Sequence, residues 1–204
     1  MARIKDGALL GKVANLVGCR YRDSYYIRKA PVRTAPPTQK ELESQFIFRL
    51  IIDWLQPLTP LLRIGFKNPR VSGFNAAHSQ LHKEAVHKEG FQSYIDPSLA
   101  KISSGSLTAT TDVQVELSPQ KQLVFTWDPT LTGNKSPRDR VLLLAYNVER
   151  KTPITELSWA KRTVGSDALD LSFAPSGIYH LYAGFVAEDG NSQSDSVYLG
   201  EVEI

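Results

Sequence analysis

The chain has 204 residues, of which 42% are hydrophobic and 22% charged, a composition typical of a globular protein with one large domain or two small ones. Its single cysteine excludes an internal disulfide, a zinc site built on several cysteines and a CxxC redox pair. No apolar run approaches the length of about 20 residues that a membrane-spanning helix needs, so we expect no transmembrane segment.

The charge is distributed unevenly along the chain. Residues 1–37 hold eight Lys or Arg and two Asp, a net charge of +6, whereas residues 101–204 hold nine basic and thirteen acidic residues, a net charge of −4. A basic N-terminal part favours contact with nucleic acid, with an anionic surface or with the acidic part of a neighbouring copy. The alternative is a hairpin with solvated polar positions, since eight cations spread over so many residues make no dense patch.

Residues 1–37 predict a basic β-hairpin arm followed by a proline-rich linker. Val13–Tyr21 and Ser24–Arg28 are rich in Val, Leu, Tyr and Ile, and Arg22-Asp23 between them suits a tight turn. An isolated two-stranded hairpin is only marginally stable in water, so this one must pack on its own chain or on another. The residues expected to form the assembly surface of the arm are Val13, Leu16, Val17, Tyr21, Tyr25, Tyr26, Ile27 and Arg28.

The same arm interleaves cations with aromatic side chains. Such a face could track phosphates and stack bases, although this alternation is also typical of a hairpin that packs one of its faces. Nucleic-acid binding is therefore an alternative to assembly. The residues expected to contact an anion are Arg20, Arg22, Arg28, Lys29 and Arg33.

Cys19 follows Leu16-Val17-Gly18, which resembles the lipid-attachment site of a bacterial lipoprotein signal. Asp6, Lys12 and Asn15 interrupt the apolar core that such a signal requires. We therefore expect no signal peptide and an inert, half-buried Cys19. A cytoplasmic or particle-associated protein follows, with export to the surface by a route that the sequence does not show as the alternative.

Residues 38–100 predict a helical region, which begins with a capping box at Thr38 and Glu41. The helical spacing of apolar residues continues from Leu42 to Leu55, and Pro57 ends this helix. Two further helices are expected on the basis of their capping and spacing. They run from Thr59 to about Phe66 and from Phe74 to Glu89, the latter starting near Ser72 or Gly73 and ending at Gly90.

Residues 101–204 predict a β-sandwich domain of the immunoglobulin or fibronectin type III kind, because seven strands follow one another with turn residues between them. The whole chain is thus expected to be an α+β protein. Candidate core members are Phe125, Trp127, Tyr146, Phe173 and Phe185. The expected strands are Val113–Leu117, Leu123–Trp127, Val141–Val148, Leu157–Val164, Leu169–Phe173, Ile178–Ala187 and Val197–Ile204, with a hairpin turn at Asp189-Gly190-Asn191.

Histidines and carboxylates are the candidates for chemistry. His78 and His82 lie one helical turn apart, so both imidazoles could share a metal. However, this HxxxH lacks the glutamate of a metalloprotease and a third ligand, so we expect an exposed polar face. His180 is expected to be a half-buried residue of a central strand. The carboxylates near strand ends are interpreted as turn formers rather than calcium ligands: Asp112, Asp128, Asp167, Asp170 and Asp189.

Four stretches carry a family resemblance: GALLGKVANLVGCRYRDSYYIRKAP, PPTQKELESQFIFRLIIDWLQPLTPLLRIGF, SGFNAA and GFVAEDGNSQSDSVYLG. Together they resemble an uncharacterised family of proteins of about this length from Bacteroidota, a domain of unknown function. The resemblance implies an N-terminal glycine-rich β arm, a helical middle and a C-terminal β-sandwich, and it implies no activity. The opening is also similar to those of small phage-derived proteins.

These observations favour a non-enzymatic structural protein without catalytic residues, metal or cofactor. We expect it to self-assemble through its N-terminal β arm, by strand complementation, into a filament, a fibre or a phage-like particle. A monomeric immunoglobulin-like module that binds protein or carbohydrate is the first alternative. A nucleic-acid-binding protein that uses the basic arm is the second.

Overall fold

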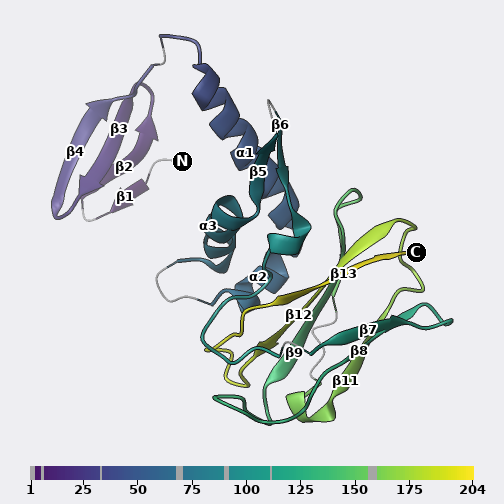
Figure 1. Cartoon of the computed structure of the whole chain (residues 1–204). Helices are drawn as coiled ribbons and strands as arrows, with labels where there is room; N and C mark the ends of the chain where they lie inside the picture. The colour runs from purple at the N-terminus through teal and green to yellow at the C-terminus, as the bar shows by residue number, and fades with distance from the viewer. Residues whose placement is uncertain are drawn as a thin grey trace. The chain divides into compact units, whose positions relative to one another are not determined.

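The structure, a computed structural model, describes residues 3–5, 7–32, 34–67, 71–89, 92–110, 112–155 and 160–204. Helices and strands are both present, which confirms the α+β class. Contacts divide the chain into two compact units, which we call unit 1 (Met1–Leu42) and unit 2 (Glu43–Ile204) (Figure 1). None of the described helices is long and apolar enough to cross a membrane.

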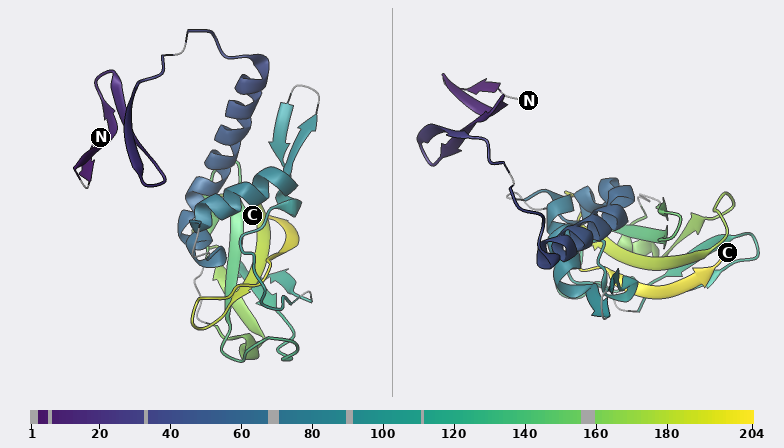
Figure 2. Two further views of the ribbon diagram at one scale, coloured as in Figure 1. Left: turned by 90° about the vertical axis from the view of Figure 1, so that its left-hand side faces the viewer. Right: turned by 90° about the horizontal axis from the view of Figure 1, so that it is seen from above.

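Unit 1 contains a four-stranded antiparallel sheet in which strands that follow one another in sequence are also neighbours in the sheet (Figure 2). The predicted turn at Arg22-Asp23 is confirmed, and Arg22 there takes a positive φ of 53°. The strands are β1 (Arg3–Lys5), β2 (Ala8–Val13), β3 (Leu16–Tyr21) and β4 (Ser24–Lys29).

The first strand of the arm was expected to run from Val13 to Tyr21, and this expectation is wrong. A turn at Ala14 and Asn15 divides it, with Ala14 in the left-handed region at a φ of 50°. Two strands, β1 and β2, precede this turn and were not expected. The sequence does not indicate this turn, because alanine rarely adopts a positive φ and is therefore not expected at such a position.

Helix α1 (Gln39–Leu55) begins as predicted. The amide of Thr38 donates to Glu41 Oε2 at 2.7 Å, and the amide of Glu41 donates to Thr38 Oγ1 at 3.4 Å, which is the reciprocal capping box. The short helices η1 (Gln56–Leu58) and α2 (Thr59–Gly65) follow, with prolines in their first turns.

The third helix is shorter than expected. Helix α3 (Gly73–Glu84) starts after the predicted N-cap Ser72, whose side chain accepts from the amide of Asn75. It ends five residues before Glu89, because β5 (Val86–Glu89) pairs with β6 (Gln92–Ile95) in a two-stranded sheet. Pairing between these strands therefore overrides a helical pattern that contained few apolar residues.

The β-rich half of unit 2 contains a four-stranded sheet in the order β10-β9-β12-β13 and a three-stranded sheet in the order β11-β8-β7 (Figure 1). The short helices η2 (Pro97–Leu99) and η3 (Arg162–Val164) lie between strands in sequence. The strands are β7 (Gln114–Leu117), β8 (Gln122–Thr126), β9 (Arg140–Asn147), β10 (Thr152–Ile154), β11 (Ser166–Asp170), β12 (Ile178–Val186) and β13 (Val197–Glu203).

Strands β9 and β12 contribute to two apolar cores because their side chains alternate between the faces of the sheet. On one face Leu142, Leu144 and Tyr146 pack with the buried residues of α1, α2 and α3. On the other face Leu143 and Phe185 pack with residues of the three-stranded sheet. The four-stranded sheet thus lies between a helical layer and a second sheet.

Three expectations for this half are wrong or fall outside the described residues. The strand expected over Leu169–Phe173 runs over Ser166–Asp170 instead, as β11. Phe173, expected in the core, is 96% exposed, whereas the other four aromatic candidates are buried. Of the strand expected over Leu157–Val164, residues 157–159 lie outside the described part, and Arg162–Val164 forms η3 instead of a strand. The short strand β10 was not expected.

Candidate functional site

The sheet of unit 1 brings together all eight residues expected to form the assembly surface. Every residue of β4 is exposed, including Tyr26 (47%) and Ile27 (59%), and only Val17 of the eight is half-buried. Both β1 and β4 are edge strands with unpaired backbone groups on one side. Unit 1 by itself therefore presents apolar side chains and open strand edges to solvent.

A glycine pair allows the central strands of this sheet to approach closely. Gly11 and Gly18 lie opposite each other in the β2–β3 pairing. A Cβ atom at Gly18 would lie 1.9 Å from the carbonyl oxygen of Leu9, a distance that no side chain tolerates. Close packing of β2 on β3 therefore requires glycine at position 18.

The cations of unit 1 fall into two groups. Arg20 lies 3.6 Å from Asp23 and its guanidinium is 5.7 Å from the ring centroid of Tyr25. Arg22 is similarly close to a tyrosine, at 5.4 Å from the ring centroid of Tyr21.

Arg28 and Lys29, in contrast, are exposed at the edge of the sheet and form no ion pair with a residue that the structure describes. Arg33 lies outside the described residues. Arg28 and Lys29 at the end of β4 are therefore open to a partner, as is the exposed Lys12 of β2.

Cys19 is half-buried in β3, as expected for an inert strand residue. Its Sγ lies 3.9 Å from the carbonyl oxygen of Val17 in the same strand. Nothing in these contacts activates the thiol.

His78 and His82 line a cavity of about 700 Å³ between α1, α3 and β5. Burial, and to a smaller extent the nearby His82, lower the pKa of His78, so its ring is neutral at physiological pH. The ring packs against Phe48 at 5.1 Å between centroids. The described residues contain no cluster of three or more His, Cys, Asp or Glu that could hold a metal ion.

His180 lies in β12, between β9 and β13, which confirms its expected place in a central strand. Its Nδ1 is 3.1 Å from the hydroxyl of Tyr198 and 3.8 Å from Glu201 Oε2. Burial lowers the pKa of His180 despite the opposing charges of Glu201 and Asp96.

Three of the five carboxylates at strand ends act as turn formers, as predicted. Asp128, Asp170 and Asp189 each accept a hydrogen bond from the amide two residues further along the chain, at 2.8 to 2.9 Å. These bonds lower the pKa values of their carboxyl groups. Oδ1 of each carboxylate is engaged within its turn.

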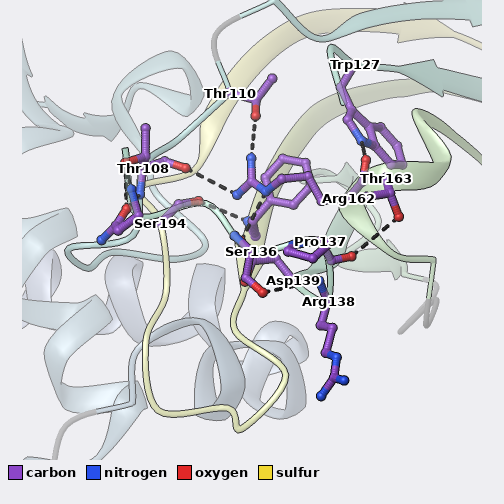
Figure 3. Close-up of polar contacts among 12 residues, drawn as sticks. Thr108, Thr110, Trp127, Ser136, Pro137, Arg138, Asp139, Arg162, Thr163 and Ser194 are labelled. Atoms are coloured by element: carbon purple, nitrogen blue, oxygen red, sulfur yellow. Dashed lines mark hydrogen bonds and ion pairs between the residues drawn. The ribbon is translucent and has the colours of Figure 1, made fainter. Parts of the chain in front are cut away.

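Sequence reasoning missed a buried ion pair between Arg162 and Asp139. Figure 3 shows Arg162 pointing toward Asp139, Thr110 and Thr108. Arg162 Nε lies 3.1 Å from Asp139 Oδ2, Nη1 donates to Thr110 Oγ1 at 2.6 Å, and Nη2 donates to the Thr108 carbonyl oxygen at 3.2 Å. The guanidinium carbon also lies 3.8 Å from the ring centroid of Phe185.

This arrangement joins loops rather than forming a reactive centre. Arg162 and Asp139 have side-chain exposures of 0% and 1%. Trp127 Nε1 donates to the carbonyl oxygen of Arg162 at 2.7 Å, which fixes η3 against the three-stranded sheet (Figure 3). No sequence signal could have identified the buried pair of Arg162 and Asp139, because charged residues are normally exposed.

Comparisons with known proteins place the chain in a family. Among curated proteins, no sequence matches it. Residues 7–200 match DUF6266, described as a family of unknown function. This match covers unit 1 from Gly7 onward, which includes β2, β3 and β4, and nearly all of unit 2. The chain therefore belongs to the DUF6266 family of unknown function.

Proposed function

We propose that this protein is a non-enzymatic structural subunit that assembles with copies of itself through the sheet of unit 1. One observation carries the proposal: β4 is an edge strand exposed at every residue, in a sheet whose tyrosine and aliphatic side chains also face solvent. Pairing an open strand with a strand of another copy satisfies its backbone groups and covers these side chains.

The composition of the sheet argues against a role as a simple spacer. A small sheet needs an apolar face packed on another layer to be stable. In unit 1 Leu16, Tyr21 and Ile27 are 42%, 63% and 59% exposed. A neighbouring copy would supply the missing layer, and contacts between different surfaces repeat into a filament, a fibre or a particle shell.

We also infer that the four-stranded and three-stranded sheets of unit 2 form an immunoglobulin-like sandwich. Tyr179, near the start of β12, donates its hydroxyl hydrogen to the carbonyl oxygen of Pro175 at 2.8 Å. A tyrosine at this corner that bonds back to the backbone a few residues upstream is typical of such sandwiches. The sandwich would then be the rigid body that the arm joins to the next copy.

Deleting residues 1–37 tests the proposal. The buried residues of both cores lie after residue 46, so the truncated chain keeps them. We expect the full chain to form oligomers in light scattering and electron microscopy, and the truncated chain to be monomeric with an unchanged thermal transition of unit 2.

A strictly monomeric full chain at high concentration would contradict the proposal and favour a monomeric binding module. A full chain that stays monomeric but shifts with single-stranded DNA at low salt would instead favour nucleic-acid binding by the cations of β4.

A further inference from the structure

The proposed assembly requires an acceptor surface, and the charge of the arm restricts where it lies. Arg28 and Lys29 are exposed and form no ion pair within the described part of the chain. The cavity between α1, α3 and β5 is a poor acceptor because Lys83 and Lys88 line it together with His82. An acceptor should instead offer an open strand edge with exposed carboxylates.

Four edge strands bound the four-stranded and three-stranded sheets of unit 2, and three of them fit poorly. In the two-stranded sheet, β5 carries Lys88 and β6 has no charged residue, so neither strand fits. Strand β10 has no charged residue, and Pro153 at its centre lacks an amide hydrogen. Strand β7 carries a single carboxylate, Glu116. In β11, Asp170 is engaged with Ser172, and Asp167 is half-buried.

Strand β13 meets both requirements. Glu201 and Glu203 are exposed and occupy alternate positions, so they lie on the same face of the strand. Val202 between them packs against the core between the two sheets. Glu203 forms no ion pair with a described residue, and Glu201 has only the contact at 3.8 Å with His180.

A bulge in β13 separates this end from the rest of the strand. The register with β12 shifts between His180 and Tyr182, and Gly200 takes a positive φ of 94°. Beyond the bulge, Glu201, Val202 and Glu203 pair regularly with β12, and no described strand pairs with their outer side. A bulge discourages unspecific pairing along an edge, so the charges at this end would decide which strand is accepted.

We propose that β4 of one copy lies along the Glu201–Glu203 end of β13 of the next copy, with Arg28 on the face of the two glutamates. This inference rests on the proposed self-assembly and names its acceptor. Donor and acceptor are different surfaces, so the contact is head-to-tail and leaves a free donor and a free acceptor at the ends of each oligomer.

Two charge-reversed full-length variants test this contact. The donor variant carries Arg28→Glu and Lys29→Glu, and the acceptor variant carries Glu201→Lys and Glu203→Lys. In each variant alone, like charges then face each other across the contact between donor and acceptor. This repulsion should raise the protein concentration needed for half-maximal assembly by at least about tenfold. An equimolar mixture should assemble again, because each reversed donor meets a reversed acceptor and each unchanged donor an unchanged acceptor.

A matched control carries Glu116→Lys and Glu149→Lys. These substitutions change the net charge by the same amount as those of the acceptor variant, at two exposed positions away from β13. It should assemble like the unmodified chain. Normal assembly of the acceptor variant, or no recovery in the mixture, would overturn the acceptor assignment. If deletion of residues 1–37 still abolishes assembly in that case, the proposed function stands and only its acceptor is wrong.

Discussion

Arg162 shows how a single residue can order several segments. Its guanidinium connects η3 with Asp139 and with the segment that contains Thr108 and Thr110, and it covers the ring of Phe185. Burial lowers the pKa of Arg162, but Asp139 opposes this shift and an arginine stays charged in proteins. Removing one partner would leave a buried charge without compensation, which costs far more than the loss of a surface pair.

We predict that Arg162→Met lowers the free energy of unfolding by about 3–5 kcal/mol, because Asp139 would remain buried without its cation. The control is Arg138→Met, since Arg138 pairs with Glu188 while its side chain is 70% exposed. That change should cost at most about 1 kcal/mol. Urea unfolding measures both variants, and similar losses for the two would contradict the role given to the buried pair.

Among the elements, the sheet of unit 1 depends on close approach between β2 and β3. Gly18→Val would place atoms against the carbonyl oxygen of Leu9 and should disrupt the pairing of these strands. Overpacking of this kind costs about 1–3 kcal/mol or more. A small sheet cannot absorb this cost, because few other contacts stabilise it. We expect hydrogen exchange of the β2 and β3 amides to accelerate and assembly to be lost.

The control for this prediction is Cys19→Ala at the neighbouring position, which removes a half-buried thiol and adds no bulk. It should preserve both the protection of the amides and assembly. Loss of assembly with Cys19→Ala alone would show that the thiol, rather than the sheet, is required.

The elements that local patterns specify could be predicted from the sequence. The capping box of Thr38 and Glu41 identified the start of α1, and alternation located most strands of unit 2. The end of α3 could not be predicted, because it depends on pairing between β5 and β6 rather than on local spacing.

The candidate site was also predictable only where local sequence patterns specify it. Composition identified the residues of the arm, and their grouping in one sheet followed from the turn at Arg22-Asp23. Their exposure could not be foreseen, since an alternating strand does not indicate whether a layer of its own chain covers it. The acceptor at Glu201 and Glu203 emerged only once the edge strands were known.

At the scale of the whole molecule, two half-buried histidines make stability depend on pH. Burial lowers the pKa values of His78 and His180 below the ordinary value of about 6.5. The unfolded chain therefore binds more protons than the folded chain as the pH falls below this value, and protonation destabilises the fold. Stability from this source is fully present above the unfolded pKa and declines at lower pH.

We predict that the free energy of unfolding decreases between about pH 7.5 and pH 5.5, across the ordinary pKa of histidine. Urea titrations at several pH values measure this decrease. The double variant His78→Gln and His180→Gln should show a smaller slope over the same range. An unchanged slope would mean that other groups cause the dependence.

The order of the strands along the chain also bears on when assembly can begin. The sheet of unit 1 consists of consecutive hairpins and is synthesised before unit 2, whereas β13 is the last strand of the described fold. Local pairings form quickly, and pairing of β13 with β12 must wait until the C-terminal strands have left the ribosome. A nascent chain would therefore carry a finished donor before it has an acceptor, so that it could join a completed neighbour but could not itself be extended until β13 has been made and paired.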